Sequence, residues 1–176
     1  KTGLIFPGEH FNDDKEQGAM LTADDFITAL QMEAHVEGGY CRELFKSQQL
    51  SDGQPLSSSI FYLLKAGQVS KFHRLKSDEL WFYHYGSPLL IHQIDDAGRL
   101  STGRLGLAVN QGELPQILVP RNRIFGAELA TTEGFCLVSC AVSPGFDYRN
   151  FELFSGATLL RLFPQHAAVI RRLNGD

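Results

Sequence analysis

The sequence predicts an all-β domain, a sandwich or barrel of short strands with one short helix near each end. From Arg42 to about Phe151, runs of β-branched and aromatic residues are bounded by turn residues such as Gly, Pro and Asn. Many short strands at regular spacing are typical of a sandwich or barrel rather than of an α/β sheet. Helical patterns of apolar residues flank this region, one near Phe26 and one after Pro164.

The N-terminal helix is expected to begin at Thr22, whose hydroxyl can cap it. Two aspartates follow in the first turn, where they suit the helix dipole. The apolar face is expected from Phe26, Ile27 and Leu30. The paired glycines of EGGY (37–40) should end the helix.

Strands are expected over 57–64, 87–95, 115–120, 123–129 and 135–142, with a turn at DDAG (95–98). The C-terminal helix should follow Pro164, a residue favoured at a helix start. Its periodic residues are Ala167, Ala168, Ile170 and Leu173.

Length and composition predict one domain over residues 21–176, preceded by a loose lead-in over 1–20. Hydrophobic residues make up 43% and charged residues 20%, as in an ordinary globular protein. The net charge is −4 and Lys and Arg are not clustered, so we expect no nucleic-acid partner. No apolar run is long enough for a membrane helix, so we expect no membrane partner.

The cysteines and the N-terminus favour the cytoplasm. Cys136 and Cys140 on one strand would lie about 13 Å apart, too far for a disulfide. We therefore expect buried thiols in a reducing compartment. The N-terminus lacks the pattern of a secretory signal, although the chain begins at Lys1 rather than Met.

The segment SKFHRLKSDELWFYHYG (70–86) carries the most informative polar residues. If its two halves pair as a hairpin about Lys76, His73 faces Glu79 and Lys71 faces Trp81. The other face would carry Phe72, Leu80, Phe82 and His84, so both faces are largely apolar or aromatic. We infer that one face lines an interior and that a helix, a second sheet or another subunit covers the other, which favours an oligomer.

The spacing of Gly67, His73, Leu75, Glu79 and Gly86 resembles the first motif of the cupin superfamily. That motif holds two histidines and a glutamate, but Leu75 stands in the second histidine position. PRNRIF (120–125) is similar to the second motif, with Asn122 in the place of a glycine and Phe125 in the place of a histidine. Asn tolerates positive φ, so the turn can survive, whereas Phe cannot bind a metal.

A closer resemblance is to the fifth numbered cupin domain family, whose members are small proteins of unknown function. It rests on EGGYCRE (37–43), SSSIFYLL (57–64), VSKFHRLKSDELWFYHYGSPL (69–89), VPRNRIFGAEL (119–129) and LVSCAVSPGFDYRNFEL (137–153). The resemblance implies a double-stranded β-helix, a homodimer and a deep pocket in the barrel. The chain departs from the family pattern at Cys41, Asn122 and Ile124.

The candidate site follows from these motifs. His73 is the candidate base, Glu79 its orienting partner and Tyr83 a candidate proton donor, although a structural His–Glu pair is an alternative. Candidate ligand contacts are Tyr40, Arg42, Phe61, Lys71, Trp81, His92 and Phe125, although aromatic residues on strands are common core residues. Only two of four metal-ligand positions are filled, so we expect no cofactor.

We therefore expect a protein that binds a small polar metabolite, sugar-like or anionic, inside a cupin barrel. As an enzyme it would perform metal-independent acid/base chemistry, like an epimerase or isomerase, by analogy of fold. One alternative is a metal-dependent oxygenase or isomerase that uses His73, Glu79 and His92. The other is a binding protein without catalysis.

Overall fold

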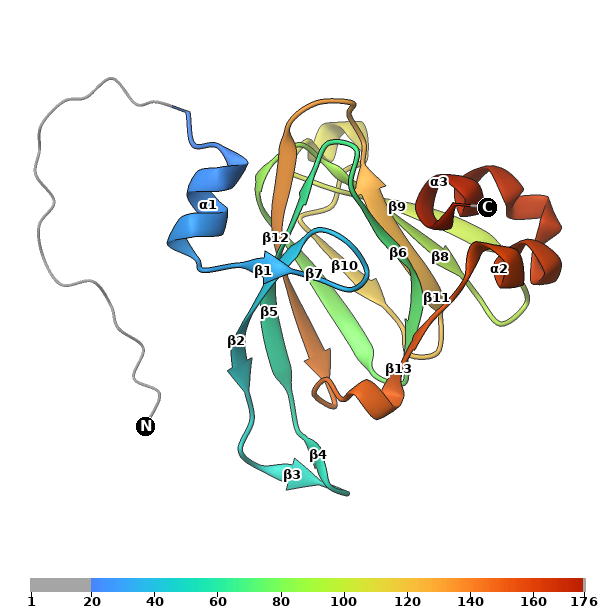
Figure 1. Cartoon of the computed structure of the whole chain (residues 1–176), viewed down its shortest axis with the longest axis horizontal. Coiled ribbons are helices and arrows are strands. Elements are labelled where there is room, and N and C mark those ends of the chain that lie inside the picture. The colour runs from blue at the N-terminus through green and yellow to red at the C-terminus, as the bar shows by residue number, and fades with distance from the viewer. Residues whose placement is uncertain (1–19, 176) are drawn as a thin grey trace, which may run out of the picture.

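The computed structural model describes residues 20–175 and contains two stacked antiparallel sheets (Figure 1). The six-stranded sheet has the order β1 (Glu33–Ala34), β2 (Tyr40–Lys46), β5 (Ser58–Lys65), β12 (Phe135–Ser143), β7 (Asp78–Gly86) and β10 (Gln116–Val119). The five-stranded sheet has the order β13 (Phe151–Leu153), β6 (Val69–Leu75), β11 (Ile124–Leu129), β8 (Leu89–Ile94) and β9 (Leu100–Leu105). This jelly-roll arrangement confirms the predicted all-β, double-stranded β-helix fold.

Short elements complete the chain. Strands β3 (Leu50–Ser51) and β4 (Gln54–Pro55) form a separate ribbon. The helices are α1 (Ala23–Ala29), α2 (Gly156–Leu162) and α3 (Ala167–Asn174), and single 3₁₀ turns are η1 (Val109–Gln111), η2 (Tyr148–Asn150) and η3 (Pro164–His166). None of the helices between residues 20 and 175 is long and apolar enough to cross a membrane. Almost all of the predicted lead-in (1–20) lies outside the described residues.

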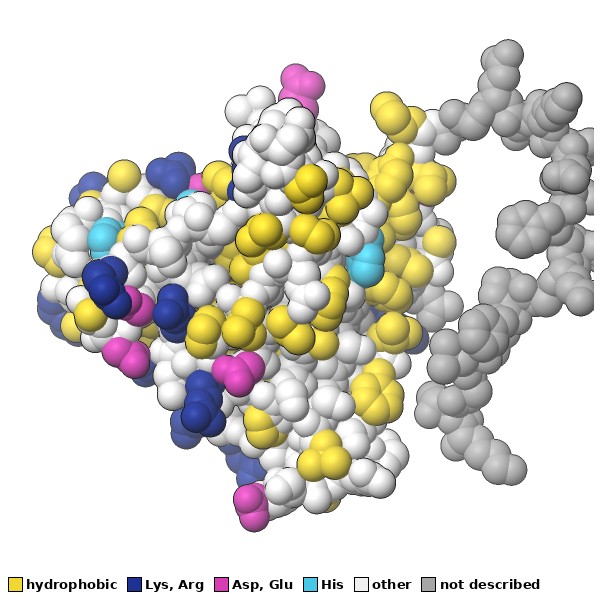
Figure 2. All heavy atoms as spheres, turned by 180° about the vertical axis from the view of Figure 1, so that it is seen from behind, with side chains coloured by type: hydrophobic (Ala, Val, Ile, Leu, Met, Phe, Trp, Pro, Cys, Tyr) yellow, Lys and Arg dark blue, Asp and Glu magenta, His cyan; other side chains and the backbone are white. Residues whose placement is uncertain are grey.

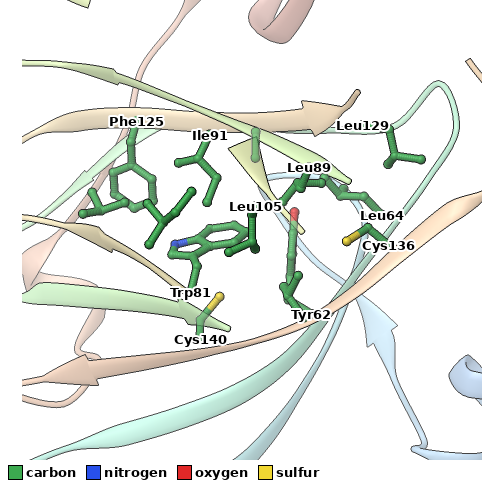
Figure 3. Close-up of a cluster of buried hydrophobic side chains, with 14 of the residues drawn as sticks. Tyr62, Leu64, Trp81, Leu89, Ile91, Leu105, Phe125, Leu129, Cys136 and Cys140 are labelled. Carbon is green, nitrogen blue, oxygen red and sulfur yellow. The ribbon is translucent and has the colours of Figure 1, made fainter. Parts of the chain in front are cut away.

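The main core lies between the two sheets, where buried side chains from both sheets meet (Figure 3). Trp81 and Cys140 come from the six-stranded sheet, and Ile91 and Phe125 come from the five-stranded sheet. Cys41, Cys136 and Cys140 are free thiols, as the sequence predicted.

Helices cover the outer faces of both sheets. Helix α1 packs Phe26 and Ile27 near Leu63 of the six-stranded sheet. Helices α2 and α3 bury Leu159 and Ile170 with Phe72 of the five-stranded sheet. Because both faces of β6 are covered, its sequence shows no clean alternation of apolar and polar residues, as we inferred.

Figure 2 shows the molecule from behind. Apolar side chains form separate groups on this face, and Lys and Arg gather toward the end that carries α2 and α3. Among the exposed large apolar residues are Leu118 of β10 and Leu162 of α2, with 50% and 52% of their surface accessible.

The predicted hairpin between β6 and β7 is wrong. The chain leaves one sheet after β6 and enters the other at β7, so these strands do not pair. His73 pairs with Phe125 and Leu153, whereas Glu79 pairs with Val119 and Val142. Lys71 therefore does not face Trp81. In a jelly roll, consecutive strands cross between sheets, which a local turn pattern does not reveal.

Two helix boundaries also differ from prediction. Helix α1 begins as expected, with Thr22 and Asp25 forming a reciprocal capping box, but it ends at Ala29 rather than near EGGY. The C-terminal region contains α2 in addition to the predicted α3. Asn122 has a φ of 67°, which confirms that it replaces glycine in a turn that needs positive φ.

Candidate functional site

A cavity of about 210 Å³ opens between the two sheets. Its wall is formed by β2, β5, β7 and β12 of one sheet, by β6 of the other, and by the segments around residues 35–37 and 146–148. The polar groups in the wall are His35, Glu37, Cys41, Glu43, Lys46, Ser58, Ser59, Tyr62, His73, Glu79, Trp81, Cys140 and Tyr148. Thus His73 and Glu79 share one cavity, but they reach it from opposite sheets.

His73 is 2% exposed, and its ring orientation is fixed by neighbours. Its Nδ1 lies 2.8 Å from the backbone oxygen of Lys71. A carbonyl oxygen only accepts hydrogen bonds, so Nδ1 carries the proton and donates it. In the neutral ring, Nε2 is then the basic nitrogen, and no described residue hydrogen-bonds it. The rings of Phe125 and Phe151 pack beside His73, with centroids 4.0 and 5.6 Å away.

The carboxylate nearest to His73 is Glu37, a residue that the sequence analysis missed. Glu37 is 8% exposed, and its Oε2 accepts a hydrogen bond from Ser70 Oγ at 3.0 Å. The same oxygen lies 3.5 Å from His73 Nδ1, and Oε1 lies 3.8 Å from His35 Nδ1. Glu37, rather than Glu79, therefore flanks the protonated nitrogen of His73.

Two glycines bring Glu37 to this position. Gly38 and Gly39 have φ values of 116° and 67°, which L side chains rarely adopt. A Cβ on Gly38 would lie 2.1 Å from the backbone oxygen of Val69, so only glycine allows this approach to β6. The available sequence signal was therefore an acidic residue directly before a glycine pair that must adopt positive φ.

Glu79 on β7 is 6% exposed and faces the cavity from the six-stranded sheet. Burial, and then the charge of Glu37, raise its pKa from 4.5 to about 8, although nearby Cys140 and Trp81 partly oppose this shift. Its Oε2 has no hydrogen-bond partner among the described residues. Glu79 is therefore mostly protonated at neutral pH.

Trp81 lies two residues further along β7 and on the same face. It is 2% exposed, and its indole Nε1 also lacks a partner among residues 20–175. The ring packs between Tyr62 and Phe125, with centroids 5.7 and 6.5 Å away in edge-to-face contacts (Figure 3). Buried N–H groups normally find an acceptor, so this donor and Glu79 Oε2 both point to a missing polar partner.

The structure thus brings His73, Glu79 and Trp81 to one cavity and places Phe125 against His73. Tyr83 is not in this cavity, because its hydroxyl donates to the Gly86 oxygen at the far end of β7.

Four of the predicted ligand contacts also lie away from the cavity. Lys71 and Arg42 are exposed and do not line it. Tyr40 and Phe61 belong to the cluster under α1, on the outer face of the six-stranded sheet.

His92 lies outside the barrel as well. It is bonded to Thr102 Oγ1 at 2.9 Å and to Glu128 Oε1 at 3.0 Å, and the same Glu128 oxygen lies 2.9 Å from Arg172 of α3. The cluster therefore lies between the five-stranded sheet and α3, and it cannot supply a third ligand beside His73.

Two thiols complete the cavity wall. Burial raises the pKa of Cys41 and of Cys140, so both stay neutral near pH 7.

The residues present do not fit a metal centre. His73 and Glu79 occupy two of the cupin ligand positions, and Leu75 and Phe125 occupy the others. Within the described part of the chain, no group of three or more His, Cys, Asp or Glu side chains is arranged to hold an ion.

A comparison with models of protein families shows which family the chain belongs to. Residues 24–154 match the model of Cupin_5, described as Cupin superfamily (DUF985). The chain belongs to this family. The resemblance seen in the sequence motifs is thereby confirmed.

Solved structures agree with this assignment. A Shewanella oneidensis protein is 48% identical, with a TM-score of 0.85, and the match covers 88% of this chain and 98% of that one. A hypothetical protein from Leishmania major is 39% identical, with a TM-score of 0.81 over 89% of this chain and 100% of that one.

A more distant neighbour shares the fold alone. Oxalate decarboxylase from Bacillus subtilis is 18% identical, with a TM-score of 0.54, over 81% of this chain and 37% of that one. None of the curated proteins compared with the chain matches it.

Proposed function

We propose that this Cupin_5 protein binds a small polar metabolite in the cavity and transfers protons on it without a metal. One observation carries the proposal: a single buried cavity contains an imidazole with a free Nε2 and a carboxyl group that keeps its proton near pH 7. An imidazole nitrogen without a hydrogen-bond partner is suited to act as a base, and a carboxyl group that keeps its proton is suited to act as an acid.

Each residue then has a distinct role in an isomerisation or epimerisation. His73 Nε2 removes a proton from the carbon next to a carbonyl group, and the C–H electron pair forms the enediol. Glu79 donates its proton to the carbonyl oxygen as this happens. Lys71 O and Glu37 are positioning groups, because they hold the Nδ1 side of the imidazole. In isomerisation the imidazolium returns its proton to the neighbouring carbon. In epimerisation water protonates the other face of the same carbon, and the imidazolium loses its proton to water. In both reactions an enediol hydroxyl gives its proton back to Glu79 as the carbonyl group forms again.

The reaction would take place in a reducing compartment such as the cytoplasm. The support for this part of the proposal is that the cysteines are free thiols and that burial raises the pKa of Cys136 to about 12.

The test is incorporation of deuterium into carbon. Four- and five-carbon aldoses and ketoses are incubated with the protein in D₂O, and NMR follows the loss of the proton next to the carbonyl. We expect His73→Gln to slow exchange at least about 100-fold, the usual minimum contribution of a general base. His84→Gln is the matched control, since His84 is exposed on the outer face of β7.

The outcomes separate the candidate functions. Exchange that survives His73→Gln would remove His73 as the base. Sugars that bind without any exchange would make the chain a binding protein rather than an enzyme.

A further inference from the structure

Two buried polar residues of the cavity wall, Trp81 and Glu79, form what we call its inner end, and they define what the ligand must offer. Trp81 Nε1 is a donor that lacks an acceptor, and Glu79 Oε2 lacks a partner as well. Both residues are more than nine-tenths buried and line the same cavity. Trp81 lies near enough to Glu79 to lower the pKa of that carboxyl, yet the two do not satisfy each other. A ligand atom that accepts a hydrogen bond from the indole would satisfy this donor.

An ammonium group does not meet this requirement. It has three donors and no lone pair, so it leaves the Trp81 N–H unpaired. An unpaired buried donor costs about 1–3 kcal/mol.

A carboxylate or phosphate would accept a hydrogen bond from Trp81, but the negative charge of Glu37 would repel it. Glu37 lies close enough to raise the pKa of Glu79, and its Oε2 already accepts from Ser70. The two cationic side chains among the predicted ligand contacts, Arg42 and Lys71, are outside the cavity. Lys46, the lysine in the wall, is exposed rather than buried among these groups.

We propose that the inner end of the cavity recognises an uncharged hydroxyl or carbonyl group, held by the Trp81 indole and the Glu79 carboxyl, and discriminates against anions and cations. A hydroxyl accepts from the indole and donates to the carboxyl oxygen, and a carbonyl accepts from both groups. This inference depends on the proposed ligand cavity and narrows its ligands to neutral polyols, sugars and hydroxyamides. With a volume of about 210 Å³, the cavity suits only small members of this class.

Trp81 is the only tryptophan of the chain, so it supplies its own probe. In ¹⁵N-labelled protein, the single indole N–H resonance reports on the inner end of the cavity. The experiment titrates this resonance at pH 7 with lactamide and lactate, with D-xylose and D-xylonate, and with cationic 1-amino-2-propanol. We expect each neutral compound to shift the resonance at a concentration at least tenfold lower than the concentration that its carboxylate counterpart requires. The same difference is expected between the neutral compounds and the amine.

A matched pair of variants isolates the charge effect. Glu37→Gln removes the buried charge. The concentration of carboxylate needed to shift the resonance, divided by the concentration of neutral compound needed, should then fall toward one. Glu152→Gln, at an exposed residue paired with Arg74 on the surface, should leave the ratio unchanged.

The outcomes distinguish this inference from the proposed function. An equal or stronger response to lactate, xylonate or the amine overturns the neutral preference and leaves the ligand cavity in place. If none of the compounds moves the indole resonance, both the inference and the ligand cavity are wrong.

Discussion

The carboxyl group of Glu79 is buried and has a pKa of about 8. Its ionisation should therefore govern how the free energy of unfolding depends on pH. In the unfolded chain its pKa returns to about 4.5. Between these values the folded state keeps a proton that the unfolded state has lost. The free energy of unfolding should therefore decrease as pH rises through this range, by roughly 1 kcal/mol per pH unit.

Urea denaturation between pH 5 and pH 8.5 measures this slope. Glu79→Gln should flatten it, whereas Glu152→Gln should not. A slope that is the same in the wild type and in Glu79→Gln would show that another group controls the dependence.

Gly38 should be essential because the backbone of Val69 leaves no room for a side chain at this position. Gly38→Ala would force a Cβ to within 2.1 Å of the Val69 oxygen, at a positive φ of 116°. Gly67 also has positive φ, 78°, but nothing lies within 4 Å of its added Cβ. Gly67→Ala should cost about 1 kcal/mol in unfolding free energy. Gly38→Ala should cost severalfold more, and equal losses in the two variants would contradict the close approach to β6.

At the scale of single residues, the sequence located part of the site. Its period of two placed His73 on one face of β6, and Glu79 with Trp81 on one face of β7. Glu37 could not be found in this way, because its contact with His73 joins a loop to a strand 36 residues later. Contacts of this kind depend on how the chain crosses over the sheet, which side-chain periodicity does not encode.

The N-terminus of α1 provides a prediction at the scale of an element. Thr22 Oγ1 donates to Asp25 Oδ2 at 2.7 Å and accepts from Asp25 N at 3.3 Å. Thr22→Ala should destabilise the helix by about 1 kcal/mol. Thr28→Ala, an exposed change inside the same helix, should have no such cost. Amide hydrogen exchange in α1 would measure both, and equal protection in the two variants would argue against the cap.

Element positions were more predictable than element pairing. The strands expected over 57–64, 123–129 and 135–142 correspond to β5, β11 and β12 within about a residue. Helix α2 was missed because Pro164, which cannot continue a helix, was taken as the start of one C-terminal helix instead of the break between two. The partners of β6 and β7 lie far along the chain, so no local pattern identifies them.

At the scale of the whole molecule, the homodimer implied by the family resemblance stays a prediction. Helices α2 and α3 cover the five-stranded sheet, whereas β10 of the six-stranded sheet leaves Leu118 half exposed. We expect sedimentation at twice 19.6 kDa. Leu118→Lys should shift the protein toward the monomer, and Leu162→Lys, at an equally exposed leucine on α2, should not. A wild-type protein that sediments as a monomer would exclude the dimer.

The order of strands in the six-stranded sheet has a consequence for biosynthesis. Strand β12 (Phe135–Ser143) lies between β5 and β7, which end 70 and 49 residues before β12 begins. A ribosome therefore releases β5 and β7 long before the strand that joins them. Until residue 143 emerges, both present unpaired edges to other chains in the cell. Any shortened gene product that stops before β12 should be insoluble, and Glu79 and Trp81 would then have no barrel to enclose them.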